Sequence, residues 1–214
     1  LPPSGFDVTF SDKYSGCIID SKKYLDKKNF KKEAIRFFND TLTFDQNACT
    51  SPRFIYWFGQ KSDIKKARDI FWSEFDSYAK NKNFSSEGKL ATDKLFAQQV
   101  AAINFNAKNN KAVSSIKRSW VDNIPEDFEK FFLPGGFFLE IGRADIHDFG
   151  NLITSKMQTL TYIGCSGEIL LRELKIGNNL GIDRVVPNGT ASDFSFIWDG
   201  MDLIRLLSKQ ISLF

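Results

Sequence analysis

Short apolar runs that predict strands alternate along this chain with longer segments whose apolar residues recur at helical spacing. Strand-like runs occupy residues 6–20 and 53–58, and they recur in the segments KMQTLTYIG and DRVVPNG. The clearest helical series consists of Phe30, Ala34, Phe37, Phe38 and Leu42. Because strands and helices alternate, the strands favour parallel pairing beneath covering helices. The pattern predicts one α/β domain built on a mostly parallel sheet.

The remaining segments extend this alternation. Apolar spacing predicts helices at residues 64–78 and 168–175, and a further helix within SSEGKLATDKLFAQQVAAINF. The segment KAVSSIKRSWVD has a strand-like pattern, and the Pro-Gly-Gly turn inside FFLPGGFFLEIG predicts a hairpin between two apolar runs. The tail, residues 199–211, is predicted to be a helix with Asp199 as its N-cap.

The composition excludes several classes of protein. A net charge of +3 over 214 residues is too small for a nucleic-acid binder, which gathers basic residues on one face. The 3 cysteines and 1 histidine lack C-x-x-C or H-x-x-x-H spacing, so no metal site is expected. Sparse, unpaired cysteines fit a reducing compartment, and no apolar run approaches the ~20 residues of a membrane span. We therefore expect a cytoplasmic protein with no membrane span.

One cysteine stands in an unusual place for a packing residue. Cys49 lies in FDQNACTSPRFIYWFG, in a polar turn just before an apolar run. Free cysteines are often buried as small hydrophobic residues, and Cys17 and Cys165 fit that description. Pro52 biases Ser51 towards extended geometry and ends the preceding helix, which would present the Cys49 thiol at the rim of the sheet. The negative end of that helix would disfavour a thiolate, so activation must come from amide donors, a cation or the substrate.

Four segments resemble the LuxC-type acyl-CoA reductases, the long-chain acyl reductase branch of the aldehyde dehydrogenase superfamily. FDQNACTSPRFIYW resembles the active-site cysteine segment of that family, and FSDKYSGCIID resembles the stretch just after its cofactor domain. MQTLTYIG is similar to its Leu-Gln-Thr strand. DRVVPNGTASDFSFIWDGMDLIRLLS is similar to its C-terminal signature, with Arg184, Pro187, Gly189, Trp198, Asp199, Gly200 and Asp202 in place. The resemblance implies a three-layer α/β sandwich like the catalytic domain of aldehyde dehydrogenases.

The resemblance also implies a reductase that works through a covalent thioester. The Cys49 thiolate would attack a fatty acyl thioester, and hydride from NADPH would release the fatty aldehyde. An oxyanion forms twice, and the Cys49 N–H and the Asn47 side chain are the expected donors to it. The family binds NADPH mainly through an N-terminal domain that is absent here, so residues 1–214 would form a single catalytic domain. The substrate would be an acyl-CoA or an acylated protein, and an acyl-protein synthetase partner and a homo-oligomer are compatible with the family.

The chain also departs from its superfamily. Classical aldehyde dehydrogenases have a glutamine two residues before the cysteine, whereas Gln46 stands three before Cys49, so that role does not transfer by position. A histidine of the CoA-dependent relatives corresponds by register to about Gln158, which makes Gln158 and Thr159 candidates for substrate binding. His147, the only histidine, lies in RADIHDFGN, which predicts the start of a surface helix rather than a catalytic base.

A competing hypothesis is a non-catalytic α/β module that serves a multi-subunit assembly, with Cys49 buried as a packing residue. An accessible Cys49 sulfur near amide donors favours the enzyme, and a sealed sulfur favours the module. The 22 phenylalanines do not separate the two hypotheses, because we expect most of them in the core rather than along an acyl tunnel.

Overall fold

The computed structural model describes residues 7–10, 12–85, 88–110, 114–123, 128–174, 181–209 and 211. Within this part of the chain a 7-stranded sheet has the order β3-β4-β5-β2-β1-β6-β7. Every neighbouring pair is parallel except β3 and β4, which are antiparallel. The strands of this sheet are β1 (Tyr14–Asp20), β2 (Pro52–Phe58), β3 (Lys108–Asn109), β4 (Lys117–Trp120), β5 (Phe137–Arg143), β6 (Met157–Ile163) and β7 (Arg184–Pro187).

Helices connect the strands, and a small ribbon follows the sheet. The ribbon is the antiparallel pair β8 (Ile197–Trp198) and β9 (Met201–Asp202). The α-helices are α1 (Ser21–Leu25), α2 (Phe30–Thr41), α3 (Lys61–Asn81), α4 (Gly88–Phe105), α5 (Gly167–Leu174) and α6 (Leu203–Leu207). The 3₁₀ helices are η1 (Leu42–Phe44), η2 (Phe128–Phe131) and η3 (His147–Leu152). None of the described helices is both long and apolar enough to cross a membrane.

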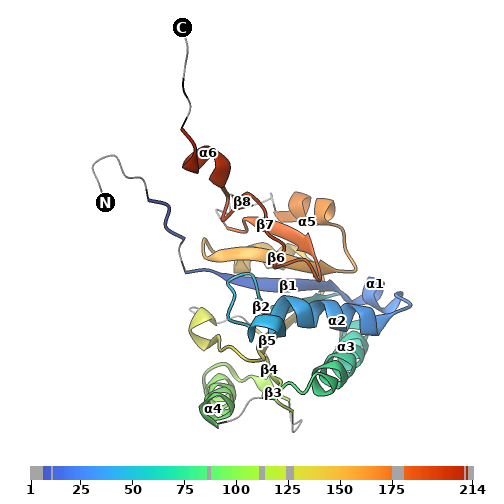
Figure 1. Ribbon diagram of the computed structural model, residues 1–214. Coiled ribbons are helices and arrows are strands. Elements are labelled where there is room, and N and C mark those ends of the chain that lie inside the picture. The colour runs from blue at the N-terminus through green and yellow to red at the C-terminus, as the bar shows by residue number, and fades with distance from the viewer. Residues whose placement is uncertain are drawn as a thin grey trace.

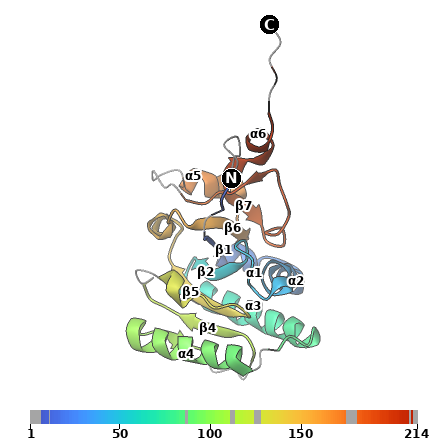
Figure 2. The same ribbon diagram turned by 60° about the vertical axis from the view of Figure 1, so that its left-hand side comes forward.

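The helices cover the sheet on both faces, which makes the three layers that the sequence predicts (Figures 1 and 2). One face packs against α1, α2 and α3, and this core contains Phe37, Trp57 and Phe71. The other face packs against α4, α5, η2 and η3, and its core contains Phe54 and Phe149. Both cores are rich in aromatic rings that meet edge to face. The expectation that most phenylalanines serve packing is therefore confirmed for these buried residues.

Two predicted elements are wrong. The segment FFLPGGFFLEIG does not form a hairpin. Its first apolar run begins at Phe131, the last residue of η2, and is not a strand. Its second apolar run forms β5, which pairs in parallel with β4 and β2. The tail is not one long helix either. Asp199 lies in the turn between β8 and β9 with a φ of 50°, and Asp202, not Asp199, caps the short α6 by accepting a hydrogen bond from the Arg205 N–H. A local capping pattern did not distinguish these two aspartates.

Candidate active site

Cys49 lies on a turn at the amino-terminal edge of the parallel sheet. The turn follows η1 and leads directly into β2, which begins at Pro52. The Cys49 side chain is exposed, which contradicts the hypothesis that it is buried packing. Open parallel sheets usually bind ligands at the carboxyl ends of their strands, so this turn lies at the opposite edge. In Figure 1 it is the edge at which the N-terminal segment joins β1.

The negative end of the α2 dipole does not disfavour a Cys49 thiolate, contrary to the expectation from the sequence. The helix ends at Thr41, and η1 then separates it from two residues in left-handed geometry, Asp45 with a φ of 51° and Gln46 with a φ of 59°. A helix dipole acts mainly within the last turn of the helix. Because η1 and this left-handed pair stand between them, Cys49 does not belong to the last turn of α2.

A single buried glutamine clamps the Cys49 turn to the sheet. The Gln46 side chain is fully buried, and its Nε2 donates hydrogen bonds to the carbonyl oxygens of Pro52, at 2.9 Å, and Phe137, at 3.0 Å. Its Oε1 accepts hydrogen bonds from the N–H groups of Gly136, at 3.0 Å, and Phe137, at 3.2 Å. The amide is therefore bonded on both sides, and it fixes the turn between the starts of β2 and β5.

A serine ties the same turn to two other strands. The Ser15 hydroxyl donates a hydrogen bond of 2.6 Å to the carbonyl oxygen of Cys49 and accepts one of 3.0 Å from the Thr159 N–H. Ser15 lies near the start of β1, and Thr159 lies near the start of β6. The backbone of Cys49 is thus held from β1 and β6 as well as from β2 and β5, while its sulfur faces solvent.

Asn47 and Cys49, the residues expected to supply oxyanion donors, are both exposed. Asn47 is exposed, and its backbone N–H donates to the Phe44 carbonyl oxygen at 2.9 Å. Within the part of the chain that the structure describes, no hydrogen bond engages the Asn47 side chain or the Cys49 N–H. Amide donors that are fixed in a turn and have no partner can stabilise negative charge on a bound carbonyl oxygen.

Gln158 and Thr159, the residues expected to bind substrate, lie at the same edge but inside the protein. Both side chains are fully buried. The Gln158 Nε2 donates to the Asp199 Oδ1, whereas the Gln158 Oε1 and the Thr159 Oγ1 have no hydrogen-bond partner in the described structure. The contact with Asp199 joins the C-terminal signature to the strand that carries Gln158, and Thr159 supports Ser15 behind the Cys49 turn.

Two more contacts attach the C-terminal signature to the sheet. Lys13, just before β1, forms an ion pair with Asp183, just before β7. The Arg184 guanidinium lies 4.8 Å from the centre of the Trp198 ring and donates to the Ala191 carbonyl oxygen at 3.1 Å. The segments that resemble the reductases therefore meet around one edge, although they are far apart in the sequence.

The other two cysteines and the histidine do not belong to this site. Cys17 is fully buried, and burial raises the pKa of its thiol. Burial likewise raises the pKa of the half-buried Cys165 to about 12. Both are packing residues, as expected. His147 is exposed at the start of η3, and its Nδ1 lies 3.3 Å from the Glu173 Oε2.

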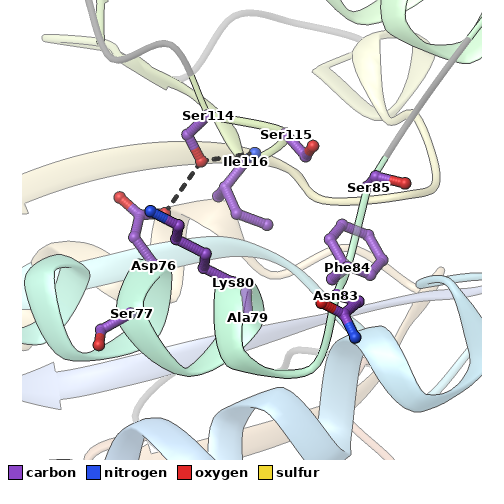
Figure 3. A pocket seen from close by; sticks show the side chains of 10 residues that line it. All are labelled: Asp76, Ser77, Ala79, Lys80, Asn83, Phe84, Ser85, Ser114, Ser115 and Ile116. Atoms are coloured by element: carbon purple, nitrogen blue, oxygen red, sulfur yellow. Dashed lines mark hydrogen bonds between the residues drawn. The ribbon is translucent and has the colours of Figure 1, made fainter.

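A further hollow lies elsewhere in the molecule, away from the Cys49 turn. A cavity of about 720 Å³ opens between the carboxyl end of α3 and residues 114–116 (Figure 3). There the Ser114 hydroxyl donates to the Asp76 Oδ1 at 3.3 Å and accepts from the Ile116 N–H at 3.0 Å. This cavity contains no residue of the Cys49 turn. The described residues also include no cluster of side chains that could hold a metal ion.

Comparison with known proteins agrees with the gathering of these segments at one edge. A family description, acyl-CoA reductase (LuxC), matches residues 1–209. The chain belongs to this family. No curated protein matches it closely enough to count as a relative. The match covers both the Cys49 turn and the C-terminal signature, so the resemblance of these segments is confirmed at the level of the family.

Solved structures show the fold of this acyl-CoA reductase family member. The chain is similar to 1-pyrroline-5-carboxylate dehydrogenase from Thermus with bound NAD, with a TM-score of 0.54 and 11% identity, over 92% of this chain and 42% of that one. It is also similar to aldehyde dehydrogenase 21 from Physcomitrella patens, with a TM-score of 0.53 and 11% identity, over 84% of this chain and 39% of that one. The expected aldehyde dehydrogenase fold is confirmed, and the chain spans about two fifths of the length of these structures.

The turns after β2 and β6 do not have the form of a dinucleotide-binding turn. Such a site needs a glycine-rich turn that leaves room for a diphosphate at the start of a helix. The turn after β6 is filled by protein, since a Cβ added to Gly164 would lie 2.9 Å from the Asp20 carbonyl oxygen. The turn after β2 has one glycine, Gly59, and no second glycine before α3 begins at Lys61. Neither turn therefore provides a G-x-G-x-x-G cradle for the diphosphate of a nicotinamide dinucleotide.

The sequence does not predict two residues that hold the Cys49 turn, Gln46 and Ser15. The spacing of Gln46 differs from that of classical aldehyde dehydrogenases, and nothing in the segment around Ser15 distinguishes it. A polar residue that bonds to backbone groups of other strands leaves no local pattern in a sequence. The position of Gln46 within the cysteine segment is the one available signal.

Proposed function

We propose that this chain is the cysteine-bearing catalytic domain of a reductase that converts fatty acyl thioesters to aldehydes through an acyl-enzyme on Cys49. The observation that carries the proposal is the exposed Cys49 sulfur on a turn held by Gln46 and Ser15, with unengaged amide donors beside it. Membership of the acyl-CoA reductase family supports acyl-CoA as the acyl donor. The aldehyde dehydrogenase fold supports oxidoreductase chemistry.

In the proposed reaction, the Cys49 thiolate attacks the carbonyl carbon of the acyl thioester. The carbon–sulfur bond of the donor then breaks, the donor leaves as a thiolate that takes up a proton, and the acyl group remains on Cys49 as a new thioester. While the carbonyl oxygen is negatively charged, the Cys49 N–H and the Asn47 side chain donate hydrogen bonds to it. We assign Gln158 and Thr159 to the buried support of this substrate site.

The reduction requires a hydride donor that the described residues do not hold. We propose that the donor is NADPH, bound mainly by a domain outside residues 1–214, and that these residues form one catalytic domain. We also propose three properties that the resemblance to the family implies: a cytoplasmic location, an acyl-protein synthetase as a partner and assembly into a homo-oligomer. Each of them is independent of the acylation chemistry at Cys49.

Mass spectrometry of the intact chain tests the acyl-enzyme directly. Incubation with a series of acyl-CoAs of different chain length should add one acyl group, which peptide mapping places on Cys49. The Cys49→Ala variant should lose the adduct, and the Cys165→Ala variant should keep it, because burial raises the pKa of that thiol and leaves it unreactive. An unmodified wild-type chain with every donor would contradict the proposed function, as would an adduct that persists in Cys49→Ala.

A further inference from the structure

A small polar cleft opens beside the Cys49 turn. Its volume is about 220 Å³. Its walls come from the starts of β1 and β2 and from two loops near them, with the lining residues Asp12, Lys13, Tyr14, Arg53, Phe132 and Lys156. Tyr14 directly precedes Ser15, whose hydroxyl bonds to the Cys49 carbonyl oxygen, and Arg53 directly follows Pro52 at the end of the Cys49 turn. The cleft therefore adjoins Cys49 without including it.

The charges of the cleft favour an anion. Lys13 is paired with Asp183, and the one acidic lining residue, Asp12, is exposed to solvent, which screens its charge. Arg53 is half-buried, and no hydrogen bond within the described residues engages its guanidinium group. Burial lowers the pKa of Arg53, while the charges of Asp12 and Cys49 act to raise it. A half-buried guanidinium with free N–H donors is stabilised by a ligand that accepts several hydrogen bonds.

We propose that this cleft binds a phosphate group of the acyl donor, with Arg53 as the main contact. The inference rests on the proposed function, because it names the chemistry of the donor that acylates Cys49. The planar guanidinium binds phosphate through two parallel hydrogen bonds, and the positive cleft attracts the anionic donor before the thioester reaches the sulfur. Coenzyme A and acyl carrier proteins share a phosphorylated pantetheine arm, so both present such a phosphate.

Three donors with the same acyl chain test the proposal: acyl-pantetheine without phosphate, acyl-4′-phosphopantetheine and acyl-CoA. Intact mass gives the rate at which each donor acylates the wild-type chain, the Arg53→Gln variant and a control, Lys61→Gln. Lys61 is exposed at the start of α3, beyond the opposite end of β2, so the control removes a charge far from the cleft. We expect Arg53→Gln to slow the phosphorylated donors by about tenfold or more, the effect of losing one hydrogen bond between charged groups. Acyl-pantetheine should react equally with all three proteins.

The outcomes separate the sources of the phosphate. A faster reaction on addition of the first phosphate would identify the arm shared by coenzyme A and carrier proteins, and a gain seen only with acyl-CoA would identify its nucleotide phosphates. Equal rates for the three donors with the wild-type chain would overturn the proposal. A uniform slowing of all donors by Arg53→Gln would also overturn it, because Arg53 would then act on the Cys49 sulfur.

A chain that no donor acylates would contradict the proposed function rather than the cleft. Calorimetric titration of the Cys49→Ala variant with free coenzyme A and with pantetheine then decides the question without any reaction. Binding of coenzyme A that is tighter than binding of pantetheine would support the phosphate site. The Arg53→Gln substitution, added to Cys49→Ala, should weaken the binding of coenzyme A about tenfold. Equal affinity for the two ligands would exclude the phosphate site.

Discussion

At the scale of single residues, the Cys49 turn depends on side chains that never meet the substrate. Gln46 bonds to backbone groups at the starts of β2 and β5, and Ser15 holds the Cys49 carbonyl oxygen. A nucleophile on a surface turn would otherwise sample many positions, and acyl transfer is sensitive to small displacements of the attacking atom. In the proposed function, the buried glutamine therefore gives the exposed Cys49 the fixed position that acyl transfer requires.

Replacement of Gln46 should show this dependence. Gln46→Ala leaves the backbone groups of Gly136 and Phe137 without their side-chain partner, and we expect a loss of about 2–4 kcal/mol in the free energy of unfolding. Urea unfolding measures it, and acylation of Cys49 should slow in parallel. Gln60→Ala is the matched control, because Gln60 is exposed and makes no side-chain hydrogen bond as the N-cap of α3. Similar stability of the two variants would show that the clamp contributes little.

At the scale of elements, α2 holds the segment that follows β7. The Asp40 carboxylate accepts hydrogen bonds from the N–H groups of Gly189, at 2.6 Å, and Ala191, at 2.9 Å. About two turns earlier in α2, the Glu33 carboxylate and the Glu33 carbonyl oxygen both accept from the Asn188 side chain. These bonds attach the part of the C-terminal signature that follows β7 to a helix on one face of the sheet.

Removal of the Asp40 carboxylate should loosen this connection. Asp40→Ala leaves two backbone N–H groups unpaired, and we expect a loss of about 1–3 kcal/mol in the free energy of unfolding, with faster hydrogen exchange at Gly189 and Ala191. Asp69→Ala, which breaks an exposed pair with Lys65, should cost less than about 1 kcal/mol. Unchanged exchange at these amides in Asp40→Ala would contradict the proposed connection.

The raised pKa of the Asp40 carboxyl group predicts that the stability of the fold depends on pH. Burial raises the pKa of Asp40 from 3.8 to about 6, so between these values the folded chain holds a proton that the unfolded chain has released. Stability should therefore fall as the pH rises through this range. Asp40→Asn should remove that part of the slope, which unfolding curves at several pH values would reveal.

At the scale of the whole molecule, four segments that are distant in the sequence converge on one edge of the sheet. The start of β1 supplies Ser15, the turn before β2 supplies Cys49, β6 supplies Gln158, and the signature after β7 supplies Asp199. The chain spans about two fifths of the length of the aldehyde dehydrogenases that share its fold. Its fold brings together Cys49 and the side chains that hold the Cys49 turn.

The proposed function predicts partial chemistry for residues 1–214 alone. The chain should take an acyl group onto Cys49 but should not oxidise NADPH, because its sequence contains no G-x-G-x-x-G turn to hold a dinucleotide. Absorbance at the nicotinamide band, recorded with acyl-CoA present, measures the second half of this prediction, and intact mass measures the first. Sustained NADPH oxidation by this chain would show that a cofactor site exists within it.

The sequence by itself determined the fold class and singled out Cys49 as the candidate nucleophile. Periodicity predicts β1, β2, β6 and α2–α3 correctly, because burial of an apolar stripe is a local property of the sequence. It also predicts the packing roles of Cys17 and Cys165. The Pro-Gly-Gly turn misled the interpretation, because a turn motif does not show whether the following strand pairs with its neighbour or with a distant strand.

Only the tertiary structure decided which residues surround the cysteine. Gln46 and Ser15 hold the Cys49 turn through backbone groups, and Arg53 lines a cleft whose other walls lie far away in the sequence. The same holds for Asp199, whose partner Gln158 lies on another strand. Hydrogen bonds of this kind form when the sheet assembles, and they leave no period or spacing in the sequence. The parallel order of the strands brings them together, and with them the support of Cys49.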